Sequence, residues 1–376
     1  MAGWYRRPQL RHRPRSDTDP IRQPVRAGRR RPTLSRGRRN TGRAHSYHRP
    51  VVFPGQSLTA PLHLADEGMF TVGGRRVTTD HPGSSPRTGS PGRGDIAVDQ
   101  MYVHYRVPLE TAKPSIVMVH GSNASGSLWE TTPDGREGWA TWFVRQGHPV
   151  FVVDHSGRGR SGFDPSSINA GTDLPNVFLA TYAREWVNGR IGPAYPTPFP
   201  GVLFPVDAFD RFMQSHVPNT ETTLEHGGAT TPACLAALLD EIGPAVLMVH
   251  SQGGLYGIET VRRRPDLVLG LVSVEGGAET LSAEDASEYF TDVPFLSLWG
   301  DNSDGADLVN GDERREGCRR AVDLITAAGG AAELLMLPEH GIGGNSHYPM
   351  MDTNSLEVAR IVDRWVTGGA MGHRKG

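Results

Sequence analysis

Residues 245–264 read AVLMVHSQGGLYGIETVRRR, and this stretch decides the fold. The apolar run Ala245–Val249 has the length and composition of a buried strand, and Gly253–Arg264 reads as a helix. Ser251 lies between them, at a tight turn. A serine in this setting is pushed out of the backbone, where its hydroxyl is free to attack a bound carbonyl group. We therefore predict that Ser251 is a nucleophile.

The residues around Ser251 match a nucleophile turn with one exception. Gly253 and Gly254 are small enough to permit a sharp bend, and the helix that follows directs its N-terminal amides at developing negative charge. Val249 stands where the G-x-S-x-G pattern has its first glycine, and its bulk crowds the turn. A serine that only caps the helix is the alternative interpretation, so the assignment depends on the rest of the chain.

Short apolar runs alternate with helical segments along most of the chain. We expect strands at residues 69–72, 101–107, 116–119, 149–153, 245–249, 269–274, 295–299 and 333–337, and helices at residues 139–146, 232–242, 253–264, 313–328 and 355–366. This alternation predicts an α/β fold with a mainly parallel central sheet and helices on both faces. In such a sheet the chemistry lies at the carboxyl ends of the strands.

Two backbone amides are candidates for stabilising an oxyanion. His120-Gly121-Ser122 follows an early buried strand, where hydrolases with this kind of sheet place one such amide. The second amide belongs to the residue after the nucleophile. We expect the N–H groups of Ser122 and Gln252 to form the oxyanion hole.

The general base is expected on the loop after the last strand, because that loop returns over the nucleophile. Two histidines, His340 and His347, lie there. His340 comes only two residues after Pro338, which is early for the chain to reach back. Residues 341–344 include three glycines, which give the loop slack before His347. We favour His347 as the base.

Two carboxylates are candidates for the acid that orients this histidine. Glu275 ends one strand, and Asp301 follows the next strand along the chain. Both lie at the carboxyl edge of the sheet, so the residues alone leave both open. Glu275 has one more methylene than an aspartate and could reach His347 from one strand closer to the nucleophile. Asp301 has an alternative use as a turn residue.

Five stretches spread over residues 69–366 carry a family resemblance. They are WETTPDGR at 129–136, SGRGRS at 156–161, HSQ at 250–252, SVE at 273–275 and GNSH at 344–347. On these motifs the chain resembles the α/β-hydrolase superfamily, and within it a bacterial esterase group related to the Alcaligenes esterase. The resemblance implies that Ser251 is the nucleophile, His347 the base and Glu275, ahead of Asp301, the acid. It also implies esters or lactones as substrates.

These observations predict a serine hydrolase that cleaves carboxylic esters or lactones of apolar or aromatic substrates through an acyl-enzyme. No cofactor or metal is expected. An acyltransferase with the same triad and a non-catalytic binding protein on the same fold are the alternatives. Residues 157–162 fit the G-x-G-x-x-G dinucleotide pattern, but Pro165 opposes the helix that this pattern requires. The histidines at 104, 120, 155 and 250 are too dispersed for a metal site.

The segment 163–232 is an insertion between sheet elements, where such hydrolases carry a lid. It is expected to separate two parts of the catalytic domain, residues 66–162 and 233–376. Nine aromatic residues lie in it: Phe163, Phe178, Tyr182, Trp186, Tyr195, Phe199, Phe204, Phe209 and Phe212. They could cover an apolar substrate pocket or form the small core of the lid itself.

The N-terminal segment has a composition unlike the rest of the chain. The 376 residues carry a formal charge of -2, yet the first 50 contain fifteen arginines and two aspartates. Residues 1–65 lack apolar periodicity and are expected to form a disordered Arg/Pro-rich tail. A nucleic-acid arm and an organelle transit peptide are alternatives. We favour a solvated extension, which also fits an early start codon in a GC-rich gene.

Several classes of protein are excluded by composition. Two cysteines, Cys234 and Cys318, cannot build a disulfide scaffold or a cysteine-rich zinc site. No run approaches the roughly 18 apolar residues of a membrane span, and no signal peptide is evident. We therefore expect a cytoplasmic protein whose partner is a small-molecule ester or lactone. Neither nucleic acid nor membrane is expected to bind, and a homo-oligomer is compatible with the sequence.

Overall fold

The computed structural model describes residues 60–172, 177–220, 227–303 and 311–369. The centre of this part of the chain is an eight-stranded sheet with the order β1-β2-β4-β3-β5-β6-β7-β8. The strands are β1 (Leu64–Thr79), β2 (Gly94–Pro108), β3 (Ser115–Val119), β4 (Val150–Asp154), β5 (Ala245–His250), β6 (Val268–Val274), β7 (Phe295–Trp299) and β8 (Ala332–Met336).

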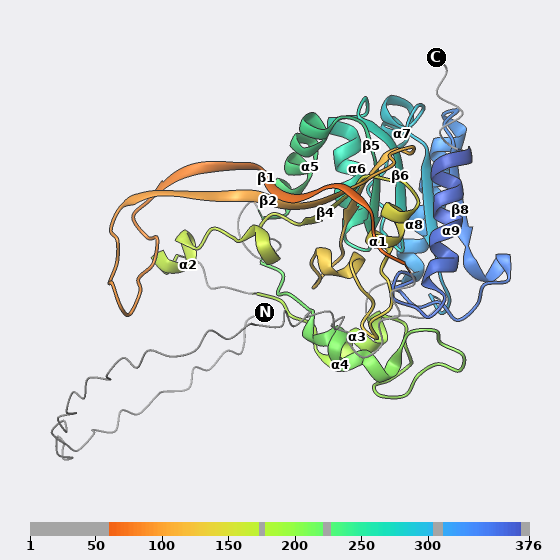
Figure 1. Cartoon of the computed structure of the whole chain (residues 1–376), viewed down its shortest axis with the longest axis horizontal. Coiled ribbons are helices and arrows are strands. Elements are labelled where there is room, and N and C mark those ends of the chain that lie inside the picture. The colour runs from red at the N-terminus through yellow and green to blue at the C-terminus, as the bar shows by residue number, and fades with distance from the viewer. Residues whose placement is uncertain (1–59, 173–176, 221–226, 304–310, 370–376) are drawn as a thin grey trace, which may run out of the picture. The chain divides into compact units, whose positions relative to one another are not determined.

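The sheet is mainly parallel. The pairs β1–β2 and β2–β4 are antiparallel, and every pair from β4 to β8 is parallel. Parallel neighbours need crossover connections, and helices supply these here. The predicted fold class, a mainly parallel sheet between helices, is confirmed (Figure 1).

Side chains of the central strand β5 alternate between the two faces of the sheet. Val246 and Met248 belong to one hydrophobic core, whereas Leu247 and Val249 belong to the other. Successive side chains of a strand point to opposite faces. A strand buried on both faces is therefore apolar throughout, which is why the run at residues 245–249 was recognisable in the sequence.

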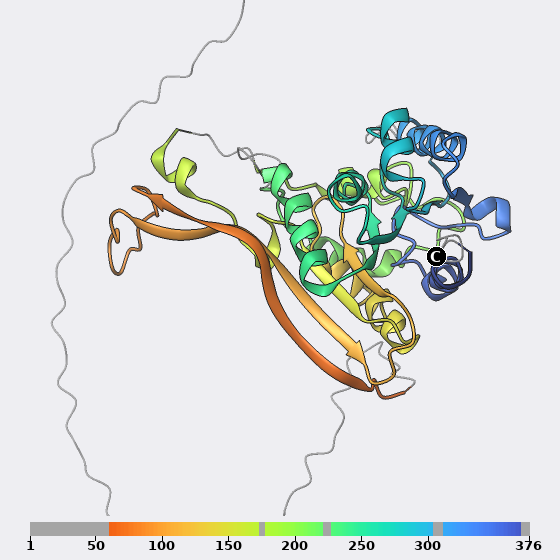
Figure 2. The same ribbon diagram turned by 90° about the horizontal axis from the view of Figure 1, so that it is seen from above.

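Helices cover both faces (Figure 2). The first core lies beneath α1 (Trp139–Arg145) and α9 (Ser355–Arg364), and α9 continues as a π-helical turn, Trp365–Gly369. The second core lies beneath α5 (Gly227–Ile242), α6 (Gly253–Arg263), α7 (Ala283–Tyr289) and α8 (Gly311–Ala327). We expected α5 to begin at Pro232, but it begins five residues earlier, at Gly227. Pro232 is thus the sixth residue of the helix, beyond the first turn, and its missing N–H costs α5 one backbone hydrogen bond.

The first two strands are much longer than the sequence indicated. Their pairing runs from Leu64 opposite Pro108 to Thr79 opposite Gly94, and the outer part forms a long curved arm in Figure 2. Much of this arm is exposed and polar, so no apolar alternation marked it as strand. Backbone hydrogen bonds across the antiparallel pair define it instead.

The insertion between β4 and α5 contains α2 (Ser166–Ala170), α3 (Tyr182–Asn188) and α4 (Phe209–Gln214). Figure 1 shows α3 and α4 grouped together at the bottom of the view. Four of its rings, those of Trp186, Phe204, Phe209 and Phe212, are at most 4% exposed. The centroids of neighbouring rings lie 4.9 to 6.1 Å apart, so the four rings pack as a small core.

Most of the Arg-rich tail, residues 1–59, lies outside the described residues. Strand β1 begins at Leu64, inside the segment expected to be tail. Within the described ranges, no helix has the length and apolar character needed to cross a membrane.

Val249, the residue that departs from the nucleophile pattern, fits because α6 has a glycine opposite it. A β-carbon on Gly257 would lie 3.2 Å from Val249 Cγ1 and 2.7 Å from Leu271 Cδ1. Both neighbours are fully buried, so neither has room to move. The bulk that Val249 adds to the strand is thus offset by the missing side chain on the helix.

Replacing Gly257 by valine is expected to lower the free energy of unfolding by about 1–3 kcal/mol through overpacking. Urea denaturation measures this change. Adding Val249→Ala should recover part of the loss, because it removes both methyl groups of Val249 that the new side chain would meet and leaves only the contact with Leu271. Gly94→Val is the matched control, since no atom lies within 4 Å of a β-carbon there. Equal unfolding midpoints for Gly257→Val and the control would contradict this account of the packing.

Candidate active site

Ser251 follows β5 directly and has a left-handed backbone conformation, with φ of 52°. Its N–H donates to the Val274 carbonyl at 3.2 Å, and its own carbonyl accepts from Gly254 N–H at 2.9 Å. A β-carbon on Gly254 would lie 2.5 Å from the Gly277 oxygen, so this position has to be glycine. These contacts hold a non-glycine residue in a conformation that costs about 1–3 kcal/mol.

His347 lies against this turn. Its Nε2 is 3.0 Å from Ser251 Oγ, and both side chains are nearly buried. Two hydrogen bonds to the backbone of His347 fix the loop: its N–H donates to the Gly189 carbonyl, and its carbonyl accepts from His250 Nε2, each at 2.9 Å. His340, the other candidate, is exposed on the 3₁₀ turn Leu337–His340.

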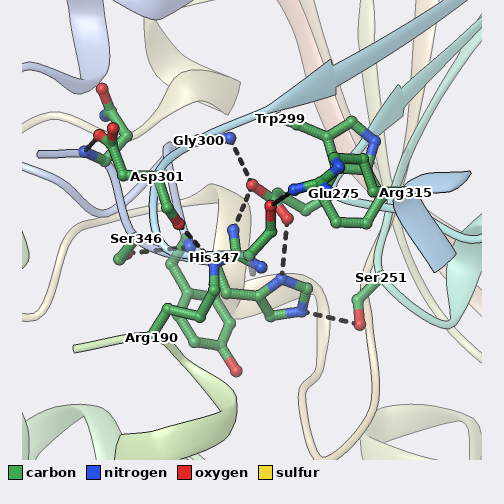
Figure 3. A network of polar contacts seen from close by, with 12 residues as sticks. Arg190, Ser251, Glu275, Trp299, Gly300, Asp301, Arg315, Ser346 and His347 are labelled. Carbon is green, nitrogen blue, oxygen red and sulfur yellow. Dashed lines mark hydrogen bonds and ion pairs between the residues drawn. The ribbon is translucent and has the colours of Figure 1, made fainter. Parts of the chain in front are cut away.

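Glu275 completes the chain of contacts (Figure 3). It follows β6 directly, has φ of 54° and is fully buried. Its Oε2 is 3.3 Å from His347 Nδ1, and its Oε1 accepts from Gly300 N–H at 2.5 Å and from Arg190 Nη2. β5 and β6 are neighbours in the sheet, and both end in a left-handed residue at the same edge.

Asp301 has a different set of partners. Its carboxylate accepts from Asn345 N–H at 2.9 Å, and its own N–H donates to the Asn345 carbonyl at 2.9 Å. The structure thus brings Glu275, and not Asp301, to the ring of His347. Asp301 thus fixes the position of Asn345, which lies two residues before His347 in the same loop.

Proteins described as an esterase and a lipase are similar to this chain. No family model matches the sequence. A solved structure described as a novel bacterial esterase is 37% identical, with 83% of this chain and 98% of that chain covered and a TM-score of 0.77. The chain belongs to the bacterial esterases of the α/β-hydrolase superfamily. This chain is also 29% identical over 317 residues to the probable secreted lipase phiG of Fungal sp. (strain ATCC 74256). The match covers 71% of this chain and 85% of that protein.

The esterase is a carboxylic ester hydrolase, and the resemblance that its motifs suggested is confirmed. The α/β-hydrolase fold also accounts for the position of Ser251 at the carboxyl edge of the central strand, where this fold carries its nucleophile.

Two loops flank Ser251 with free backbone donors. Within the described part of the chain, no residue accepts a hydrogen bond from the N–H of Ser122 or Gln252. A β-carbon on Gly121 would lie 2.8 Å from Ser251 Cβ, so the first loop approaches the serine closely. The Ser122 hydroxyl accepts a 2.7 Å bond from Asn219 Nδ2, which comes from the insertion.

Arg158 lies within the G-x-G-x-x-G match and is buried beneath these loops. Its Nη1 donates to the Gly121 carbonyl at 2.7 Å, and its Nη2 donates to Gln252 Oε1 at 3.1 Å. The motif opens only a 3₁₀ turn, Gly159–Ser161, and not the long helix of a dinucleotide site. It therefore ties the two candidate oxyanion loops together. Among the described residues, no group of His, Cys, Asp or Glu is arranged to hold a metal ion.

No sequence pattern predicted a role for Arg190 in the site. It lies in the insertion, is 2% exposed and has φ of 51°. Its guanidinium pairs with Glu275 and donates from Nε to the Asp301 carbonyl at 2.8 Å. Burial raises the pKa of Glu275, but Arg190 and His347 outweigh it and bring that pKa down to about 2. Glu275 is thus an anion at neutral pH and remains one well into the acidic range.

The same surroundings keep His347 neutral. Burial lowers the pKa of His347, whereas Glu275 raises it, and the net shift is downward. A neutral ring with its proton on Nδ1, toward the carboxylate, leaves Nε2 free to accept a proton from Ser251.

A cavity of about 90 Å³ opens beside Ser251 and His347. Glu185 on α3 lines it, accepts a hydrogen bond from the Tyr348 hydroxyl and lies 3.6 Å from His216 Nε2. Burial raises the pKa of Glu185, but His216 and Tyr348 bring it below the ordinary value. The cavity wall therefore includes an ionised carboxylate whose partners are already in place.

Removing Arg190 is expected to leave a buried, unpaired carboxylate. Arg190→Met should lower the free energy of unfolding by about 3–5 kcal/mol, as measured by chemical denaturation. The double variant Arg190→Met/Glu275→Gln removes both charges and should be more stable than Arg190→Met alone. Arg263→Met, at an exposed ion pair, is the control and should change stability by less than about 0.5 kcal/mol. A double variant as unstable as the sum of its single variants would show that the pair is not coupled.

Proposed function

We propose that the esterase cleaves carboxylic esters or lactones through a covalent acyl-enzyme, with Ser251 as nucleophile, His347 as base and Glu275 as acid. The observation that carries the proposal is the continuous chain of contacts from Ser251 Oγ through the His347 ring to Glu275 Oε2, at 3.0 and 3.3 Å. Relatives of this fold use the same three roles in the same order along the chain, nucleophile, acid, base.

In the first half of the reaction, Ser251 Oγ bonds to the carbonyl carbon while its proton passes to His347 Nε2. The carbonyl π electrons move to the oxygen, and the N–H groups of Ser122 and Gln252 donate to the oxyanion. When the carbonyl re-forms, the C–O bond to the alcohol breaks, and the alcohol oxygen takes the proton from Nε2. Glu275 stabilises the imidazolium in between.

In the second half, water replaces the alcohol. His347 Nε2 takes a proton from the water as its oxygen attacks the acyl carbon, and returns that proton to Ser251 Oγ as the acyl bond breaks. The product is a carboxylic acid. With a lactone, the alcohol of the first half stays attached to the acyl group, so ring opening gives a hydroxy acid.

The apolar part of the substrate is proposed to lie against the insertion. Phe178 from the insertion and Tyr348 from the histidine loop both line the cavity beside Ser251. We assign residues 163–232 the role of a cover that belongs to the site, since its Gly189 carbonyl and Arg190 side chain bind His347 and Glu275. The cytoplasmic location, the lack of nucleic-acid binding and the oligomeric state stay predictions.

Ser251→Ala should reduce kcat for a panel of nitrophenyl esters and lactones by at least about a thousandfold, with an unchanged melting temperature. A serine-directed organophosphonate should inactivate the native enzyme and should not label the variant. Turnover close to that of the native enzyme in Ser251→Ala would refute covalent catalysis at this residue.

The choice of acid is tested by two amide substitutions. Glu275→Gln removes the anion that holds the tautomer of His347, and should cut kcat by about four orders of magnitude. Asp301→Asn keeps an oxygen to accept from Asn345 and should cost far less. The reverse ranking would transfer the acid role to Asp301.

The pH profile reports on the base. Since the pKa of His347 is lowered, the midpoint of the decline of kcat/KM at acidic pH should lie below the ordinary histidine value of 6.5. In Glu275→Gln the carboxylate that raises this pKa is lost, so the midpoint should move to still lower pH. NMR titration of the His347 ring in both proteins provides the comparison. A midpoint above 6.5 in the native enzyme would contradict the assignment.

A further inference from the structure

Two arginines line the cavity beside Ser251 and His347. Arg314 projects from the first turn of α8, and Arg184 projects from α3 in the insertion. They come from segments 130 residues apart in the chain and border the same cavity of about 90 Å³. Neither takes part in the chain of contacts from Ser251 to Glu275.

Neither arginine is paired with a carboxylate among the described residues. Arg314 Nη2 donates to the backbone carbonyl of Glu275 at 2.9 Å, and the guanidinium of Arg184 lies 5.2 Å from the centre of the Phe178 ring. The carboxylate that shares the cavity wall, Glu185, is already bound by Tyr348 and His216. Both guanidinium groups thus retain donors that no described acidic side chain uses.

Two other arginines, Arg190 and Arg160, form ion pairs with carboxylates of the protein. Arg190 binds Glu275 and the Asp301 carbonyl, and Arg160 makes bonds of 2.8 and 3.0 Å to Asp154. Arg190 and Arg160 therefore have structural partners, whereas Arg184 and Arg314 border the cavity. Burial lowers the pKa of the Arg314 guanidinium, and the nearby charges of Glu275 and Glu279 offset this only in part, so a bound anion would stabilise the charge further.

We propose that Arg184 and Arg314 bind a carboxylate of the substrate, so that the esterase prefers esters carrying an acidic group a few bonds from the scissile carbonyl. The proposal rests on the proposed function, because it places the anion relative to acylation at Ser251. A guanidinium binds a carboxylate through two parallel N–H···O bonds, which fixes orientation as well as charge. The apolar part of the same substrate would lie against Phe178 and Tyr348.

The test compares substrates that differ only in charge. Mono(4-nitrophenyl) adipate and 4-nitrophenyl hexanoate share a six-carbon acyl chain, and only the first ends in a carboxylate. A second pair, 3-acetoxybenzoate and 3-acetoxybenzamide, carries the difference on the alcohol side. For at least one pair, kcat/KM of the native enzyme should be at least about tenfold higher for the anionic member, the size of one charge-assisted hydrogen bond. The pair that responds tells on which side of the ester the anion binds.

Arg184→Met and Arg314→Met should each lower this selectivity ratio about tenfold. Arg319→Met is the matched control: it lies on the same helix, is half exposed at an ion pair with Glu316, and should leave the ratio unchanged. Among the described residues, no hydrogen bond or ion pair joins Arg184 to the triad, so this residue keeps the test decisive if Arg314→Met fails to fold. Ratios near one for both substrate pairs, or ratios that neither arginine variant lowers, would overturn the proposal.

These outcomes are separate from failure of the proposed function. If the triad assignment were wrong, Ser251→Ala would still hydrolyse the neutral esters. If only the carboxylate site were wrong, Ser251→Ala would be inactive and the charge preference alone would be missing.

Discussion

The buried carboxylate of Glu275 is the group on which the site depends. It lies without solvent contact, and three donors from different parts of the chain satisfy it: Arg190 in the insertion, Gly300 N–H after β7, and the ring of His347 after β8. A buried charge is tolerated only when it is paired and hydrogen-bonded. The requirement to satisfy one anion therefore draws the insertion and two loops to the edge of the sheet beside Ser251.

Because the insertion supplies some of these contacts, it is part of the site and not an accessory. Its Gly189 carbonyl binds the backbone of His347, its Arg190 binds Glu275, and its Asn219 binds Ser122. Its aromatic rings pack mainly on one another, so they stabilise the segment that carries these polar groups. The hydrophobic core of the insertion and the polar geometry of the site thus depend on each other.

The sequence indicated the sheet and the places of Ser251 and His347, because parallel strands bring their carboxyl ends to one edge and chain order then limits the candidates. Spacing could not choose between Glu275 and Asp301, since both follow strands at that edge and only side-chain directions separate them. Arg190 gave no signal, because a left-handed residue in an irregular segment has no periodicity. The helices of the insertion span only five to seven residues, too short for a helical pattern to show.

Six non-glycine residues in the described part of the chain have positive φ, and four of them belong to the site: Asn123 and Ser251 line its cavity, and Arg190 and Glu275 form its buried ion pair. Each costs about 1–3 kcal/mol, so this cluster is where the molecule gives up stability for geometry. Glycine adopts such a conformation freely and would remove the cost at position 251. Laboratory evolution for heat resistance alone would therefore reward the loss of the serine, and only a selection that also scores turnover would retain it.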